Sequence, residues 1–241
     1  MDDKQYFESI KKGLRNSSTD KLFTIAVDQS YKNSGISISV GNPYHEFKLV
    51  ECMNIDGSKA KNKIEYRNII KQAIIEMLDR NKQAMDECKY KICIVERIRQ
   101  FSHGFINIDY IKSIGSLIAY ISEAVDEFGI ATYSVDTRCW KKTVIGTCKA
   151  ESNKYNIAEE KYPTVEYLAK NKMKGFIFEE VGQEEGKKLM GRKNPKNIFL
   201  SKSGKYIKVD DDKADSICIS LFAFEAMRQN KNLHEFLKRE S

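Results

Sequence analysis

The sequence predicts a mixed α/β fold in which a five-stranded sheet is flanked by helices. Two observations support this prediction. Short runs rich in β-branched and aromatic residues are bounded by turn residues, and longer segments with helical periodicity separate the later runs. Their order along the chain is β-β-β-α-β-α-β-α, followed by a closing helix. The length of 241 residues fits one large domain, or one domain with an insertion.

The expected strands are short apolar runs, two of which end in an acid. The first three are joined by turns around Tyr31–Ser34 and Gly41–Pro43, so they form an antiparallel meander. The five expected strands cover residues 22–28, 34–40, 45–55, 90–96 and 131–135.

The expected helices follow from apolar residues spaced three and four apart. They cover residues 61–80, about 104–128, most of 137–172 with an interruption near Gly146, 212–227, and a short terminal helix at 233–237. Residues 1–20 are expected to be a helical or loose N-terminal extension, and residues 21–241 the main domain. A basic insertion at about 173–208 precedes the last long helix, and residues 197–209 are expected to form a β-hairpin with Gly204 in its turn.

Composition indicates a globular chain. It is 41% hydrophobic and 31% charged, which argues against disorder. No apolar run reaches the roughly 18–20 residues needed to span a bilayer, and residues 1–21 are polar. We therefore expect a cytoplasmic protein with no membrane partner. The small size and the lysine-rich composition suggest a bacteriophage or low-GC bacterial source, so the cytoplasm would be that of a bacterium or a phage-infected host. The six cysteines show no metal-binding spacing, so a zinc site is not expected.

Positive charge is concentrated in one segment. The net charge is +7, and residues 187–208 contribute +8 with no Asp or Glu among them, so the remainder sums to about −1. A local cationic patch is typical of proteins that bind nucleic acid. The alternative is a lysine-rich loop that only favours solubility.

Four carboxylates are placed where a site could form. Asp28 and Glu96 each end a buried strand, and strand ends are where sites are built in mixed sheets. Asp212 and Asp215 open a buried helix and, three residues apart, share one face of it. Such hard oxygen ligands suit Mg²⁺ or Mn²⁺. Two such ions could activate a water and stabilise a leaving 3′ oxygen.

Each acid also has a structural explanation. An Asp after a strand commonly forms a turn, and Asp210–Asp212 could cap a helix. Asp215 differs, because the buried helix that follows it means that its carboxylate needs a partner. The choice among Asp210, Asp211 and Asp212 as a ligand stays open.

Four segments resemble motifs of the RuvC-like Holliday-junction resolvases of the ribonuclease-H-like superfamily, and they follow one another along the chain in the same order as in that family. IAVDQSYKNSGISI (25–38) resembles the first strand and turn, with the pattern D-x-S-x₄-G, and ICIVERIRQF (92–101) resembles the strand with the catalytic Glu. TRCWKKTVIGTCKAESNK (137–154) resembles the segment with a Lys, a V-x-G motif and a downstream Lys. DDDKADSICISL (210–221) resembles the closing helix. The resemblance spans roughly residues 22–154 and 209–228.

This resemblance implies a ribonuclease-H-like fold and particular roles. Asp28, Glu96, Asp212 and Asp215 would be catalytic and bind two Mg²⁺ ions, with Mn²⁺ as a substitute, and Lys141 would lie near the scissile phosphate. The sequence departs from the family where Gln29-Ser30 replaces the usual Pro-Gly. It also has Arg99 where an aromatic usually helps to open the junction; Phe101 could stack on a base or belong to the core. The residues expected to bind DNA are Arg99, Phe101, Lys141, Lys142, Lys149, Lys154, Arg192, Lys193, Lys202 and Lys205.

The expected function is a metal-dependent, structure-selective endodeoxyribonuclease. It would resolve four-way DNA junctions by paired cuts that leave 5′-phosphate and 3′-hydroxyl ends. Paired cuts require two sites, so a homodimer is expected, with the helix at 104–128 as its face by resemblance to the family. Two alternatives stay open: a nuclease of this fold acting on other branched DNA or on RNA/DNA hybrids, and a non-catalytic architectural protein that binds DNA.

Overall fold

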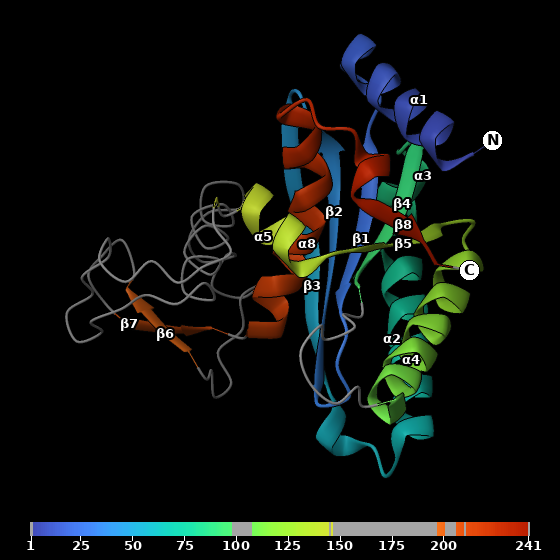
Figure 1. Ribbon diagram of the computed structural model, residues 1–241, viewed down its shortest axis with the longest axis vertical. Helices are drawn as coiled ribbons and strands as arrows, with labels where there is room; N and C mark the ends of the chain where they lie inside the picture. The colour runs from blue at the N-terminus through green and yellow to red at the C-terminus, as the bar shows by residue number, and fades with distance from the viewer. Residues whose placement is uncertain are drawn as a thin grey trace.

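The computed structural model describes residues 2–97, 108–144, 146, 197–200, 206–209 and 211–240 (Figure 1). Most of them belong to one sheet and the helices on its two faces. In chain order the elements are α1 (Asp3–Asn16), β1 (Leu22–Asp28), β2 (Asn33–Asn42), β3 (Glu46–Asp56), the 3₁₀ turn η1 (Gly57–Lys59), α2 (Lys63–Arg80), α3 (Lys82–Asp86), β4 (Tyr90–Glu96), α4 (Ile108–Asp126), β5 (Ala131–Val135), α5 (Thr137–Val144), β6 (Asn197–Leu200), β7 (Tyr206–Val209), α8 (Asp211–Arg228), the 3₁₀ turn η2 (Leu233–Glu235) and β8 (Leu237–Arg239).

The main sheet has the order β3-β2-β1-β4-β5-β8. The first three strands form the expected antiparallel meander, and β4 and β5 run parallel to β1. The two parallel strands reach the sheet through helical crossovers, which parallel pairing requires. The sheet is therefore mixed, and the predicted fold class is confirmed.

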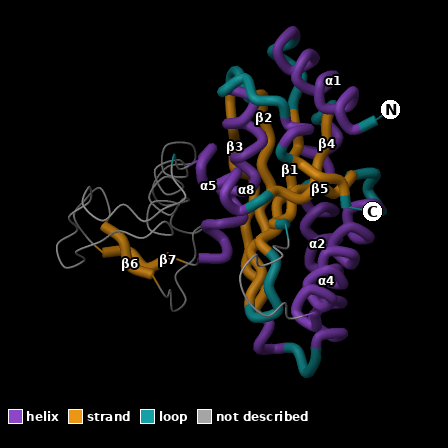
Figure 2. Tube along the Cα trace, in the orientation of Figure 1, coloured by secondary structure: helices purple, strands orange, loops and turns teal. Residues whose placement is uncertain are grey.

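Helices cover both faces of the sheet (Figure 2). Alternate side chains of β1 separate the two layers: Leu22 and Ala26 pack with α1, α5 and α8, whereas Phe23, Ile25 and Val27 pack with α2 and α4. The same period of two holds on β4. Because α8 packs into the first layer along most of its length, it is apolar nearly all round, as its sequence predicts.

Small residues on β2 let α8 lie close to the sheet. The Ser37 hydroxyl donates to the Ser216 carbonyl at 2.9 Å, and the buried hydroxyls of Ser39 and Ser220 are 2.9 Å apart. Two residues of a strand advance about 6.6 Å and four residues of a helix advance about 6 Å. Every second residue of β2 can therefore contact every fourth residue of α8. The next pair in the series, toward the start of both elements, is Gly35 with Asp212.

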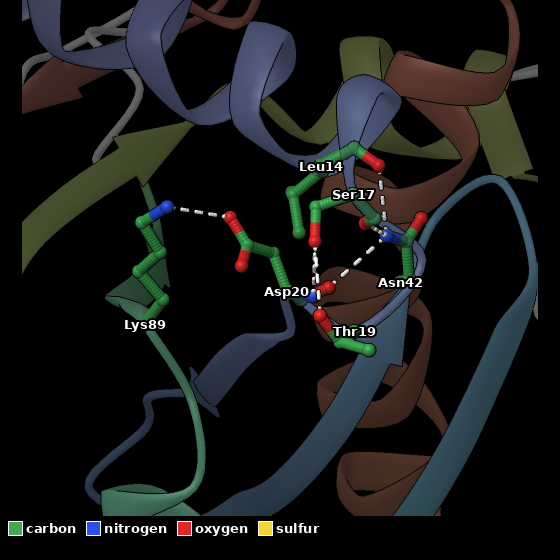
Figure 3. A network of polar contacts seen from close by, with 6 residues as sticks. All are labelled: Leu14, Ser17, Thr19, Asp20, Asn42 and Lys89. Atoms are coloured by element: carbon green, nitrogen blue, oxygen red, sulfur yellow. Dashed lines mark hydrogen bonds and ion pairs between the residues drawn. The ribbon is translucent and has the colours of Figure 1, made fainter.

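The N-terminal segment is an ordered helix that belongs to the core. Phe7, Ile10 and Leu14 of α1 are buried in the layer that contains α8. Its C-terminal end is held by the buried amide of Asn42, which donates to the carbonyls of Leu14, Ser17 and Asp20 at 2.8–3.0 Å (Figure 3). Of the two forms expected for residues 1–20, the helical one is therefore correct.

The C-terminal segment differs from the prediction. The sequence predicts a short helix at residues 233–237, but the structure has the 3₁₀ turn η2 followed by the strand β8, which pairs antiparallel with β5. A five-residue segment cannot sustain a helix by periodicity alone, and the exposed edge of β5 offers unpaired backbone groups. The sheet thus has six strands, where the sequence predicts five.

The remaining expectations concern the segment after β5. Helix α5 ends at Val144, and Gly146 has a φ of +92° and donates its N–H to the Lys142 carbonyl, which accounts for the expected interruption. The hairpin expected at 197–209 is present as the antiparallel pair β6 and β7. Most of the expected basic insertion at about 173–208 lies outside the described residues, as does the helix expected beyond Gly146.

Candidate active site

Strand periodicity brings Asp28 and Glu96 to one face of the sheet. On β1 and β4 the even-numbered residues Ala26 and Ile94 face the α8 layer, and Asp28 and Glu96 follow two residues later on the same side. The parallel register that pairs Ala26 with Ile94 carries the two acids to adjacent strand ends. They are therefore neighbours beneath the start of α8.

The first turn of α8 brings the other two acids. Asp28 pairs with Gly35 across the β1–β2 ladder, and Gly35 in turn lies against the backbone of Asp212. A Cβ at Gly35 would be 1.8 Å from the Asp212 carbonyl oxygen and 2.8 Å from the Lys213 nitrogen. Only glycine permits this approach. The helix N-terminus also favours the negative charge of Asp212 and Asp215.

The pKa of Asp28 reflects the charges of the other three acids and of Lys141. Burial raises the pKa of the Asp28 carboxyl well above its usual range, and the charges of Asp215, Glu96 and Asp212 raise it further, in that order. The ammonium of Lys141 opposes them and lowers this pKa. The structure thus places the other four residues expected to be catalytic within electrostatic reach of Asp28.

Two side chains hydrogen-bond to Glu96. The indole N–H of Trp140, on α5, donates to Glu96 Oε1 at 3.0 Å. The Gln29 amide donates to the Glu96 carbonyl and accepts from the Glu96 N–H at 3.1 Å. The side-chain amide of Gln29 therefore extends the hydrogen bonding between β1 and β4 by one residue, in place of backbone groups.

The two lysines of α5 occupy different environments. Lys141 is partly buried, and its ammonium lies 5.1 Å from the centre of the Trp140 ring, in the range of a cation–π contact. Lys142 is exposed, whereas Lys141 is among the main charges that shift the pKa of Asp28. Lys141 therefore belongs to the site, whereas Lys142 lies on the surface beside it.

A hydroxyl network braces the turn between Asp28 and Gly35. The Ser34 hydroxyl donates to the Ser30 carbonyl at 2.9 Å and accepts from the Ser30 N–H at 3.1 Å. The Tyr66 hydroxyl, from α2, lies 2.9 Å from Ser34 Oγ, and burial is the main cause that raises the pKa of Tyr66 to about 12. This turn is therefore fixed from the opposite layer of the molecule.

Sequence reasoning missed Gln29, Ser34 and Tyr66 as supports of the site. The sequence indicates Tyr66 only as part of the apolar stripe of a helix. The role of Gln29 could have been predicted, because a long amide side chain directly after an acid at a strand end can hydrogen-bond to the neighbouring strand. The other residues expected to bind DNA, namely Arg99, Phe101, Lys149, Lys154, Arg192, Lys193, Lys202 and Lys205, lie outside the described residues.

The donor set has the chemistry of a hard-cation site. Carboxylate oxygens are what Mg²⁺ and Mn²⁺ prefer, and the four acids carry more negative charge than Lys141 balances. Within the described ranges, no His, Cys, Asp or Glu side chains gather in groups of three or more that could hold a metal ion. The charges of Glu96, Asp212 and Asp215 nevertheless act on Asp28. Like charges repel, and a cation among them would favour closer approach.

Comparisons with known proteins bear on the fold. Neither protein-family models nor curated protein sequences gave a match. Among solved structures, RuvC of Thermus thermophilus superposes with a TM-score of 0.53 and 14% identity, covering 90% of this chain and 99% of that protein. The T. thermophilus RuvC structure in complex with a Holliday junction substrate gives 0.53 and 12%, covering 91% and 99%.

These similarities define the class of fold. The chain has a RuvC-like fold of the ribonuclease-H-like type, over nearly the whole length of the T. thermophilus protein. At such low identity the likeness concerns the fold alone. Within the part of the chain that the structure describes, no helix is both long and apolar enough to cross a membrane.

Proposed function

We propose that this protein is a divalent-metal-dependent, structure-selective endonuclease that cuts four-way DNA junctions and leaves 5′-phosphate and 3′-hydroxyl ends. The observation that carries the proposal is the convergence of Asp28, Glu96, Asp212 and Asp215 with Lys141 at one end of the sheet. The RuvC-like fold supports it, since the T. thermophilus protein of this fold was solved with a Holliday junction substrate.

The acids and the lysine divide the work of the proposed reaction. Asp28, Glu96, Asp212 and Asp215 would hold two Mg²⁺ ions, or Mn²⁺, which when bound would activate a water and stabilise the leaving 3′ oxygen. Lys141 carries a mobile positive charge suited to a phosphate oxygen of the cleaved strand. Gln29 and Trp140 hydrogen-bond to Glu96, and Gly35 leaves room for the backbone of Asp212.

Paired cuts on opposing strands require two sites, so we propose a homodimer that uses the start of α4. The large apolar side chains most exposed among the described residues are Ile64, Ile108 and Tyr110. They lie at one end of a parallel helix pair, because Lys63 of α2 bonds to Ser113 of α4 and Lys71 bonds to Glu123. An exposed apolar group of this kind favours an interface.

The basic segment 187–208 is the proposed second contact with DNA, on the evidence of its charge. Removing residues 187–205 should weaken junction binding and reduce its salt dependence while leaving Mg²⁺ binding intact. Unchanged binding and an unchanged salt dependence would contradict this contact.

The deciding experiment is cleavage of a synthetic four-way junction with Mg²⁺, beside a flap and an RNA/DNA hybrid. The wild type should nick the junction at symmetric positions. Asp28→Asn and Asp215→Asn should abolish cleavage and keep DNA affinity, whereas Asp79→Asn, which removes an exposed acid of α2, should cleave like the wild type.

Each contrary result identifies an alternative. Faster cleavage of the flap or the hybrid would assign a different substrate to the same site. DNA binding without any cleavage in Mg²⁺ or Mn²⁺ would make the protein an architectural one.

A further inference from the structure

Glu96 is the acid of the site whose polar contacts are most fully defined. Gln29 bonds to both its N–H and its carbonyl, so the backbone cannot shift along the strand. The Trp140 N–H engages Oε1 at 3.0 Å, so rotation of the carboxylate is restricted as well. An ionised carboxylate has about four lone-pair positions, so one donated bond leaves oxygen sites open to a cation.

Trp140 is suited to hold a fixed position. Its side chain has no exposure to solvent and is among the largest fully buried side chains of the described core. It packs in the layer formed by α8, β1, β4 and β5. Protein interiors are close-packed, so the ring has little room to change its rotamer. An indole N–H donates only, so the bond to Glu96 has one direction and one acceptor.

The same ring also contacts the cation of the site. Lys141 Nζ lies 5.1 Å from the ring centre, while the ring nitrogen bonds to Glu96. One rigid side chain thus contacts both an acid and the ammonium that opposes the acids at Asp28.

We propose that Trp140 is a positioning residue that pre-orients the Glu96 carboxylate for a divalent cation. This inference rests on the proposed function and adds a specific part to it. Partners that hydrogen-bond to metal-binding carboxylates fix their orientation, and loss of such a partner typically weakens metal binding about 10- to 100-fold. Without the N–H, the Glu96 carboxylate would sample orientations that cannot bind the cation. Binding of the cation would then have to overcome the entropy cost of fixing the carboxylate in one orientation.

The chain offers a direct probe, because Trp140 is its single tryptophan. An ¹⁵N-labelled sample therefore gives one indole N–H signal. In the absence of divalent cation, Glu96→Ala should move that signal upfield, since it removes the charged acceptor. Glu123→Ala, a change at an exposed residue of α4, should leave it in place. An indole signal that does not respond to Glu96→Ala would overturn the proposal.

A single-atom replacement tests the role itself. Biosynthetic replacement of Trp140 by β-(3-benzothienyl)alanine exchanges the N–H for sulfur and retains the shape of the ring. Calorimetric titration with MgCl₂, without DNA, should show binding weakened about tenfold or more. Junction cleavage should need correspondingly more Mg²⁺ and return to within about twofold of the wild-type rate at saturation, whereas a packing defect would lower the maximal rate or the melting temperature.

The outcomes separate this inference from the proposed function. If the wild type binds Mg²⁺ and cleaves junctions, and the benzothienyl protein binds Mg²⁺ equally well, the positioning role is wrong and the nuclease stands. If the wild type neither binds Mg²⁺ nor cleaves, both proposals fail, even if the indole signal still reports the bond to Glu96.

Discussion

Replacing Gly35 by alanine should damage the site more than it damages the fold. The added Cβ would lie 1.8 Å from the Asp212 carbonyl oxygen and 2.2 Å from its carbon. These are backbone atoms, which cannot rotate away as a flexible side chain can. Ordinary contact begins near 3.4 Å, so strand and helix must separate by about 1.6 Å at this point.

The size of the effect follows from that displacement. Overpacking of this kind costs about 1–3 kcal/mol of unfolding free energy, a cost that a domain of this size can tolerate. A displacement of about 1 Å in a catalytic group can lower a rate about 100-fold. Gly35→Ala should therefore remain folded and bind junctions, yet cleave them about 100-fold more slowly or worse.

The assay is single-turnover cleavage of the four-way junction at saturating Mg²⁺, with chemical denaturation measured in parallel. Gly129→Ala is the matched control, because Gly129 has a φ of +68° and a Cβ added there would meet no atom within 4 Å. It should lose about 1 kcal/mol through backbone strain and cleave normally. Cleavage by Gly35→Ala within threefold of the wild-type rate would refute the argument.

Three further predictions concern charge, pairing and anchoring. Without divalent cations, Asp28→Asn should raise the melting temperature at pH 8, because folding raises the pKa of the Asp28 carboxyl and its ionised form therefore destabilises the folded state. The difference in melting temperature should shrink as the pH falls toward 3.8, the ordinary pKa of Asp, where the carboxyl is protonated in the folded state. A difference that does not depend on pH would contradict this prediction. Gln29→Leu should slow junction cleavage about tenfold and lower stability by less than about 2 kcal/mol, and an unchanged rate would count against its role. Asn42→Ala should lower the free energy of unfolding by about 2–4 kcal/mol, measured by urea denaturation, because three carbonyls lose their donor. Mg²⁺ binding should stay the same, and weaker Mg²⁺ binding would mean that Asn42 also supports the site.

Much of the site could be predicted from the sequence, because it depends on local periodicity. An acid two residues beyond a buried strand residue must face the same layer, which relates Asp28 to Ala26 and Glu96 to Ile94. The buried character of α8 likewise follows from its run of apolar residues. The pattern of strands and helices was enough to define the mixed sheet.

Other features depend on contacts between residues distant in sequence. Strand β8 exists because β5 has an edge to pair with, and no pattern within residues 237–239 indicates this. The bond from Trp140 to Glu96 spans 44 residues, and the clash that requires glycine at position 35 comes from Asp212. Such constraints become visible only when the register and the packing of α8 are known.

Because α8 supplies two of the four acids, the site is complete only after α8 has been synthesised. A nascent chain that has emerged only as far as β5 already contains Asp28 and Glu96, but not Asp212 or Asp215, which are synthesised more than 100 residues after Glu96. The α8 layer of the core is also incomplete at that stage. The set of four acids is therefore complete only late in synthesis, together with one face of the core, so the proposed nuclease activity would be absent from partly made chains.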